Sequence, residues 1–163
     1  MPHKYLVKEF EQFALSAANT ESLMQHVSER IHLHIPRYNW VGFYLIDKKD
    51  SATLALGPHV GSFAPNPRIS MNEGLCGSAA FTRRVAVSDN VTEDPRYIQA
   101  SDLVKSQISV PVLANAMSVA VFNVESYFLA TFKNPIERNF VETCAGIVGK
   151  FFAATMHRDL VRA

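Results

Sequence analysis

Residues 73–81, EGLCGSAAF, place Cys76 between Gly74 and Gly77, where the sequence predicts the start of a helix. The positive end of a helix dipole lowers the pKa of a nearby thiol and makes the reactive thiolate more abundant. Three interpretations of Cys76 stay open at this point. It is a small residue packed in a tight turn, a redox-sensitive thiol or a catalytic one.

Other side chains that suit a binding site lie on predicted strands. Trp40 and Tyr44 are four residues apart in NWVGFYLID, so they share one strand face and either cap a ligand or pack in a core. Glu125 faces either a pocket or solvent. His32 and His34 point to different sides of a helix, which makes them poor joint ligands. We therefore predict no metal and no cofactor.

These residues depend on helices and strands that position them. Apolar residues at helical spacing predict four helices, at 5–17, 20–35, about 75–82 and from 134 onward. Runs of β-branched and aromatic residues predict six strands, at 39–47, 52–61, near 69, 85–89, 107–113 and 117–126. The segment between the fourth and fifth strands is long and irregular. Within it, Asp94–Tyr97 either opens a short helix or forms only a turn.

Hairpins dominate this order and the long helices lie at the two ends, which is typical of an α+β fold with a mainly antiparallel sheet. We expect a central antiparallel sheet of about five or six strands, with the terminal helices packed on one face. The middle helix and the long loop then cover the other face, where a pocket can form.

The composition limits the classes of function. The 163 residues are predicted to form one domain, 1–163, and the formal net charge of +1 gives no reason to expect nucleic acid or a membrane as a partner. The N-terminal stretch mixes Lys and Glu with apolar residues and does not resemble a secretory signal, so we expect a cytoplasmic protein. Two cysteines make a structural disulfide unexpected there. Cys144 falls on the apolar face of the last helix and is predicted to be a core residue.

Several stretches together resemble a GAF domain over about residues 20–155. They are NWVGFYLID, LALGPHVG, EGLCGSAAFTRRVAVSDNVTEDPRY, SQISVPVL and VAVFNVES. Among GAF proteins the chain most resembles the free methionine-(R)-sulfoxide reductases, which are single GAF domains of this size. The resemblance implies the GAF fold and a pocket between the sheet and the segment 74–107.

The resemblance also implies that two of the reductases' three cysteines are missing. Cys76 matches one of them, but Ala64-Pro65-Asn66 stands at the first and Ala100 at the third, which attacks the sulfoxide. The acidic residues of the reductases correspond to three residues here: Gln107, Asn123 and Glu125. Sulfoxide reduction needs an attacking thiolate and a second thiol that releases the product as a disulfide.

The sequence therefore favours a stand-alone GAF domain that binds a small molecule in a sensory or regulatory role and has lost catalysis. The alternative is a free methionine-(R)-sulfoxide reductase that uses Cys76. The predicted ligand-binding residues are Trp40, Tyr44, Leu75, Cys76, Tyr97, Ile98, Gln107, Asn123 and Glu125. We also predict a homodimer through the first and last helices, because the last helix is apolar over more than one face.

Overall fold

The computed structural model describes residues 1–162, and its elements follow the predicted order. The helices are α1 (His3–Ala14), α2 (Thr20–His34), α3 (Gly74–Thr82) and α4 (Pro135–Arg162), with 3-10 turns η1 (Val91–Glu93) and η2 (Thr131–Lys133). The strands are β1 (Trp40–Ile46), β2 (Thr53–Gly61), β3 (Arg68–Ser70), β4 (Ala86–Ser88), β5 (Ser106–Ala114) and β6 (Met117–Ser126). Each helix and strand predicted from the pattern is present.

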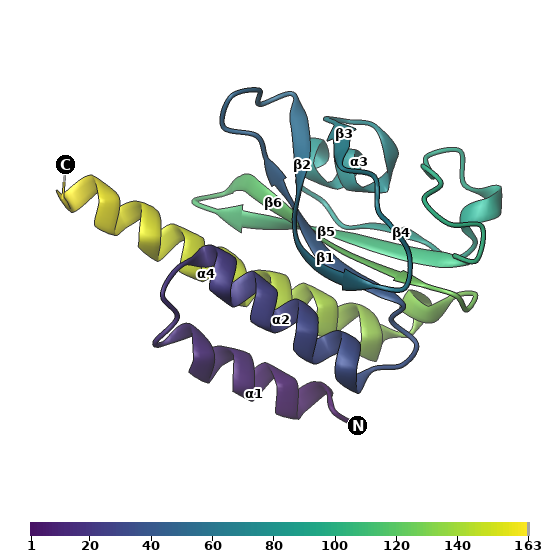
Figure 1. The fold of residues 1–163 in the computed structure, drawn as a ribbon, viewed down its shortest axis with the longest axis horizontal. Coiled ribbons are helices and arrows are strands. Elements are labelled where there is room, and N and C mark those ends of the chain that lie inside the picture. The colour runs from purple at the N-terminus through teal and green to yellow at the C-terminus, as the bar shows by residue number, and fades with distance from the viewer. Residues whose placement is uncertain (163) are drawn as a thin grey trace.

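The six strands form one antiparallel sheet in the order β3-β2-β1-β6-β5-β4, which confirms the predicted α+β class (Figure 1). The tight β5–β6 turn depends on Asn115 and Ala116, whose φ angles of 53° and 65° are both left-handed. Two such residues twist a hairpin in the same sense as its strands. The β1–β6 register pairs Trp40 with Glu125 and Gly42 with Asn123, so the centre of the sheet carries several of the predicted site residues.

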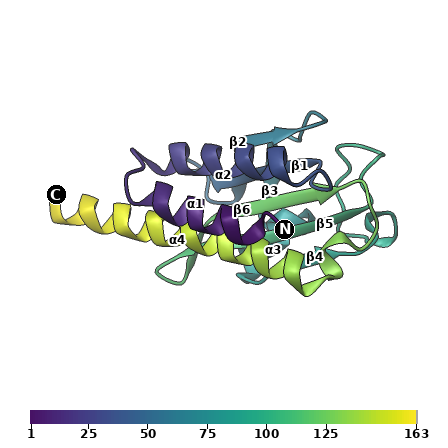
Figure 2. The ribbon, with the colours of Figure 1, turned by 90° about the horizontal axis from the view of Figure 1, so that it is seen from below.

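One face of the sheet is covered by α2 and α4, and α1 packs on the outer side of these two helices. The larger apolar core lies between these helices and the sheet (Figure 2). Asn19 caps α2, because its side-chain oxygen accepts a hydrogen bond from the backbone N–H of Ser22 at 2.8 Å. Phe43 and Phe122 stack at 4.5 Å on the sheet side of this core. Cys144 is fully buried within it, which confirms that it is a core residue.

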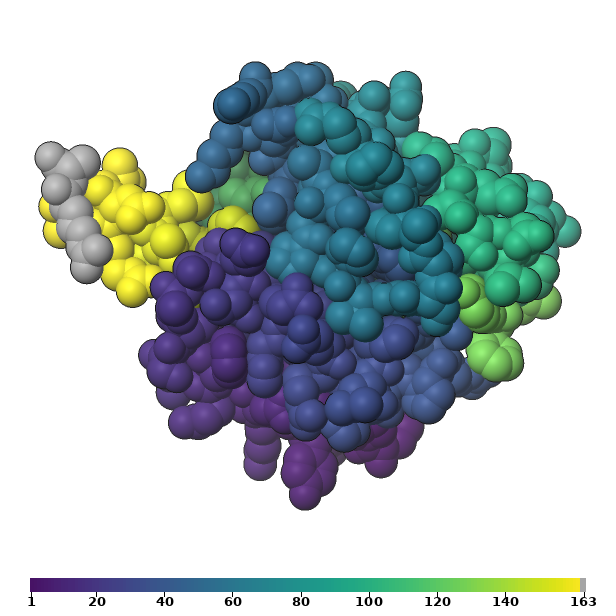
Figure 3. All heavy atoms as spheres, in the orientation of Figure 1, coloured from purple at the N-terminus to yellow at the C-terminus, as the bar shows by residue number. Residues whose placement is uncertain are grey.

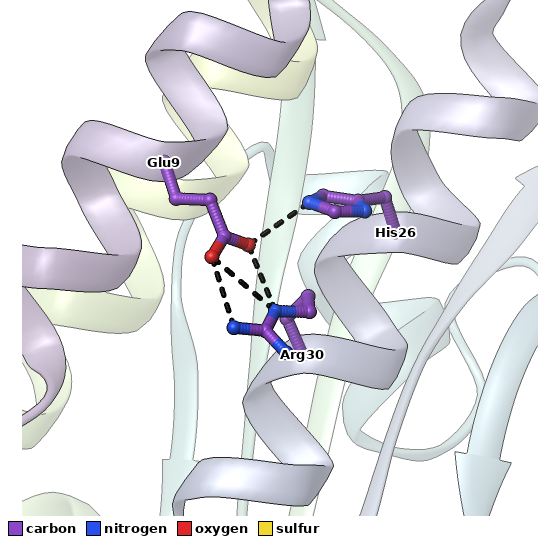
Figure 4. Close-up of polar contacts among 3 residues, drawn as sticks. All are labelled: Glu9, His26 and Arg30. Atoms are coloured by element: carbon purple, nitrogen blue, oxygen red, sulfur yellow. Dashed lines mark hydrogen bonds and ion pairs between the residues drawn. The ribbon is translucent and has the colours of Figure 1, made fainter.

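A polar cluster ties α1 to α2 at the outer side of this helical layer (Figure 4). His26 and Arg30 both bind the carboxylate of Glu9, at 2.9 Å for His26 Nε2 and 3.0 Å for Arg30 Nη2. The hydrogen bond from Arg30 is the main cause of a lowered pKa for Glu9. Phe13 stacks flat on the His26 ring at 3.9 Å. These contacts join α1 to α2.

The opposite face of the sheet carries α3 and the segment 89–105, as the sequence predicted (Figure 1). A smaller apolar cluster lies between α3 and the sheet and includes Leu75, Ala79 and Trp40. No helix begins at Asp94. Its carboxylate accepts hydrogen bonds from the backbone and side chain of Arg96, so the turn is the correct interpretation of this stretch.

The last turns of α4 extend beyond the sheet and project from the body of the molecule (Figures 1 and 3). They carry exposed apolar side chains, with Leu160 77% and Val161 73% exposed. The homodimer through the first and last helices stays a prediction. Within residues 1–162, no helix combines the length and the apolar character that crossing a bilayer requires.

Candidate functional site

A line of polar side chains is buried on the α3 face of the central strands. Alternation along β5 and β6 places Gln107, Ser109, Asn123 and Glu125 on this one face, and all four are buried. The Asn123 oxygen accepts hydrogen bonds from Gln107 Nε2 and Ser109 Oγ, each at 2.8 Å. Asn123 Nδ2 then donates to Glu125 Oε2 at 3.2 Å. The Glu125 carboxyl is therefore the acidic end of a chain of amide and hydroxyl groups.

Cys76 contacts this polar line from α3. Its Sγ lies 3.4 Å from Ser109 Oγ and 4.0 Å from Gln107 Nε2. A helix start on its own would lower the pKa of this thiol, but the Cys76 side chain is buried and only 3% exposed. Burial is the main cause that raises the pKa of Cys76 to about 12. The Glu125 carboxyl acts in the same direction, and the hydrogen bond with Ser109 opposes the rise in part.

Glu125 faces the site and not solvent, which settles the alternative that the sequence left open. Burial raises the pKa of its carboxyl to about 7, and the single hydrogen bond from Asn123 opposes that rise only in part. Near neutral pH Glu125 therefore exchanges a proton. A buried carboxyl of this kind can hold a cationic group of a ligand or supply a proton to it.

Two aromatic residues of β1 lie at this site: Tyr44 lines it, and Trp40 stacks beside Tyr44. Tyr44 donates a hydrogen bond to the Asn66 carbonyl at 2.8 Å, and burial raises its pKa. Trp40 stacks beside Tyr44 at 6.0 Å and against His59 at 5.6 Å. Within residues 1–162 the buried Trp40 Nε1 has no hydrogen-bond partner. A Cβ at Gly61 would meet the Trp40 ring, so Gly61 leaves the space that the indole fills.

A small cavity lies between these strands, α3 and the loop above them. Its volume is about 20 Å³, room for about one water molecule. It is lined by Tyr44, Asn66, Ile69, Gly74, Leu75, Cys76, Ile98, Ala100, Gln107, Asn123 and Glu125. Ile98, in the loop, closes the cavity. Its side chain lies so close to Gly74 that a Cβ added at Gly74 would be 2.7 Å from Ile98 Cδ1.

The structure brings together seven of the nine predicted ligand residues around this cavity. Trp40 lies beside Tyr44 and does not line the cavity, whereas Tyr97 lies toward the surface and donates to the Ser101 carbonyl at 3.2 Å. Sequence reasoning missed Ile69 and Ser109. Ser109 was detectable, because it lies two residues after Gln107 on a strand and therefore shares its face.

Two residues that the sequence related only to missing cysteines also line the cavity. Asn66 and Ala100 face it from two different loops, near Cys76. The second thiol of the chain, Cys144, lies in the core on the other side of the sheet. Among residues 1–162 no group of three or more His, Cys, Asp or Glu side chains is placed to hold a metal ion.

Comparisons with known proteins agree with this architecture. The GAF domain family matches residues 17–153. The free methionine-R-sulfoxide reductase of Saccharomyces cerevisiae is 29% identical over 134 residues, which cover 82% of this chain and 72% of that protein. The enzyme of the same name from Escherichia coli is 28% identical over 127 residues, which cover 77% of this chain and 74% of that protein.

A solved structure gives the same result in three dimensions. The free methionine-R-sulfoxide reductase of Neisseria meningitidis, determined in complex with its substrate, superimposes with a TM-score of 0.87 at 26% identity. The match covers 96% of this chain and 91% of that one. The topology, the family match over most of the chain and this superposition lead to one conclusion: the chain belongs to the GAF domain family.

Proposed function

We propose that the chain binds free methionine-(R)-sulfoxide in the cavity beneath Ile98 and reduces it slowly, with Cys76 as the reacting thiol. The observation that carries the proposal is the position of Cys76 Sγ, 3.4 Å from Ser109 Oγ in a buried polar site that ends in Glu125. The names of the similar proteins support this reductase hypothesis more than the sensory role that the sequence alone favoured.

With a single thiol in the site, sulfoxide reduction becomes catalytic only when an external reductant restores the oxidised Cys76. The Cys76 thiolate attacks the sulfoxide sulfur, the S–O bond breaks, and the oxygen is transferred to give methionine and a sulfenic acid on Cys76. The methionine sulfur gains two electrons and Cys76 loses two. Two equivalents of a small external thiol then return Cys76 to its reduced form and release water and a disulfide.

Two features of the site make this reaction slow. The pKa of about 12 leaves very little thiolate at neutral pH. The cavity of about 20 Å³ also admits a free amino acid only when the covering segment that carries Ile98 moves aside. Glu125, with a pKa of about 7, can protonate the sulfoxide oxygen as it is transferred to Cys76.

The test measures binding and turnover separately. Binding of the R-sulfoxide, the S-sulfoxide and methionine is followed by the emission of Trp40, the only tryptophan, and by calorimetry. Turnover is followed as methionine released in the presence of dithiothreitol. We expect binding selective for the R-sulfoxide and slow release of methionine. Cys76→Ala is expected to abolish turnover and keep binding, while Cys144→Ala, the matched control, keeps both.

Binding without turnover would refute the reductase proposal and restore the sensory role. Failure to bind any of the three compounds would refute both. The pH profile gives a further check: the thiolate increases with pH while protonated Glu125 decreases, so the rate should rise to about pH 7 and then level off. Glu125→Gln should be slower and lose that plateau.

A further inference from the structure

Ser109 carries a fully buried hydroxyl at the centre of the site, and the reaction proposed above assigns it no role. It lies on β5, directly opposite Asn123 of β6 in the strand register. Its Oγ lies 3.4 Å from the Sγ of Cys76, whereas Gln107 Nε2 is 4.0 Å from that sulfur. Ser109 does not line the cavity, so a ligand there would meet Cys76 and Asn123 but not Ser109.

The single hydrogen of the Ser109 hydroxyl is donated to Asn123. Ser109 Oγ donates to Asn123 Oδ1 at 2.8 Å, and Gln107 Nε2 donates to the same oxygen, also at 2.8 Å. A carbonyl oxygen has two lone pairs, so Asn123 Oδ1 already accepts its full number of hydrogen bonds. In this arrangement Ser109 has no hydrogen left for the sulfur, and its contact with Cys76 is one in which the S–H donates to the hydroxyl oxygen.

A thiolate needs the opposite direction, because it has no proton and can only accept a hydrogen bond. A hydroxyl hydrogen can turn about the C–O bond while every heavy atom stays in place. We infer that Ser109 is a positioning residue that couples Asn123 to Cys76. Its hydrogen points to Asn123 Oδ1 in the arrangement seen here, and it turns to the sulfur when another donor takes its place on that oxygen. The thiol then loses its proton to solvent more readily, because Ser109 donates a charge-assisted hydrogen bond to the thiolate.

This coupling would make Cys76 more reactive when a ligand is bound. Asn123 lines the cavity, so a donor group of a ligand, such as the ammonium of an amino acid, can replace the Ser109 hydroxyl on Asn123 Oδ1. This consequence rests on the proposed function. The coupling itself involves only side chains of this chain and can be tested without any ligand.

The experiment measures the rate at which iodoacetamide alkylates Cys76 at pH 8, followed by mass spectrometry at reagent concentrations to which the rate is proportional. The thiolate forms an S–C bond and iodide leaves, so the rate follows the fraction of thiolate. Asn123→Leu keeps a similar shape but has no acceptor, which frees the Ser109 hydrogen for the sulfur. We expect it to raise the rate about fivefold, and Ser109→Ala to lower the rate. In the double variant the rate should return to that of Ser109→Ala.

A purely structural role of Ser109 predicts the opposite sign. Loss of packing beneath α3 would let the site open more easily and speed the labelling, whereas loss of the hydroxyl donor slows it. Ser106→Ala is the matched control, because it removes a buried hydroxyl of the same strand that binds the Phe128 carbonyl and faces away from α3. It should leave the labelling of Cys76 unchanged. Labelling of Cys144 in the same samples measures global unfolding.

The same variants separate this inference from the proposed function. In a parent chain that reduces the R-sulfoxide, Ser109→Ala should lower kcat and leave KM unchanged, because Ser109 does not line the cavity. Without turnover in the parent chain the reductase proposal fails, and the labelling rates still decide on the coupling. Unchanged or faster labelling of Ser109→Ala would overturn the inference. So would an effect of Asn123→Leu that persists in the double variant.

Discussion

The two faces of the sheet differ in what they bury. Phe122 and Asn123 are neighbours on β6, and both are almost completely inaccessible. Phe122 enters the apolar core beneath the helices and stacks on Phe43, whereas Asn123 joins a line of amide, hydroxyl and carboxyl groups. One face is therefore built for stability, and the other holds desolvated polar groups that cost free energy unless they are paired.

The largest expected effect is on the helical face. Phe122→Ala should lower the free energy of unfolding by about 3–5 kcal/mol, because it removes a fully buried ring and leaves a cavity in a close-packed core. Urea denaturation followed by circular dichroism measures the change. Asn123→Ala is the matched comparison on the other face. It should cost less, because it removes a smaller side chain, and its cost comes mainly from the hydrogen bonds that Gln107, Ser109 and Glu125 lose. Equal losses would show that the two faces do not differ in this way.

The second prediction concerns pH and the site face. Burial raises the pKa of Glu125 from 4.5 to about 7 in the folded chain. Folded protein then binds more protons than unfolded protein between these values, so the contribution of Glu125 to stability is fully present below about pH 4.5 and is lost as the pH rises through about 7. The loss amounts to about 3 kcal/mol at most, since each pKa unit corresponds to about 1.4 kcal/mol.

Urea denaturation at pH 5 and at pH 8 tests whether stability falls as the pH rises. Glu125→Gln has no carboxyl to ionise, so it should lose that part of the pH dependence and be more stable than the parent chain at pH 8. Glu73→Gln, at an exposed position before α3, serves as a control and should keep the dependence. A parent chain that becomes more stable between pH 5 and pH 8 would contradict the prediction.

The contrast between the faces explains which features the sequence could predict. Helix and strand positions follow from periodicity, so the order of the elements and the antiparallel sheet were predictable. The thiol pKa of Cys76 was not predictable from the sequence. It depends on how completely α3 shields the site from water, and no local sequence pattern indicates this. Similarly, alternation indicates which face Glu125 lies on, but whether that face is covered depends on a loop without secondary structure.

A third prediction concerns the aromatic residues at the site, and its effect should be intermediate. Gly61→Ala places a Cβ against the Trp40 ring, which is fully buried and packed on both sides. The indole must shift, and overpacking of this kind costs about 1–3 kcal/mol. Trp40 emission should change together with stability. Gly146→Ala is the control, because its added Cβ meets open space and neither property should worsen. An unchanged emission in Gly61→Ala would mean that Trp40 is loosely packed.

The last prediction concerns the reactivity of the two thiols and involves no change in stability. Both are buried with a raised pKa, but Cys144 lies in the helical core, while Cys76 lies beneath the covering segment 97–104, which belongs to no helix or strand. A segment of this kind opens at lower free energy than a core, so Cys76 should react first with an excess of iodoacetamide under native conditions. Mass spectrometry of Cys76→Ala and Cys144→Ala identifies the labelled thiol and its rate.

Raising urea should accelerate the labelling of Cys144 much more than that of Cys76, because Cys144 is reached only through global unfolding. Equal rates with equal urea dependence would show that the site opens only when the whole domain unfolds, and then no free amino acid would enter the cavity at a useful rate.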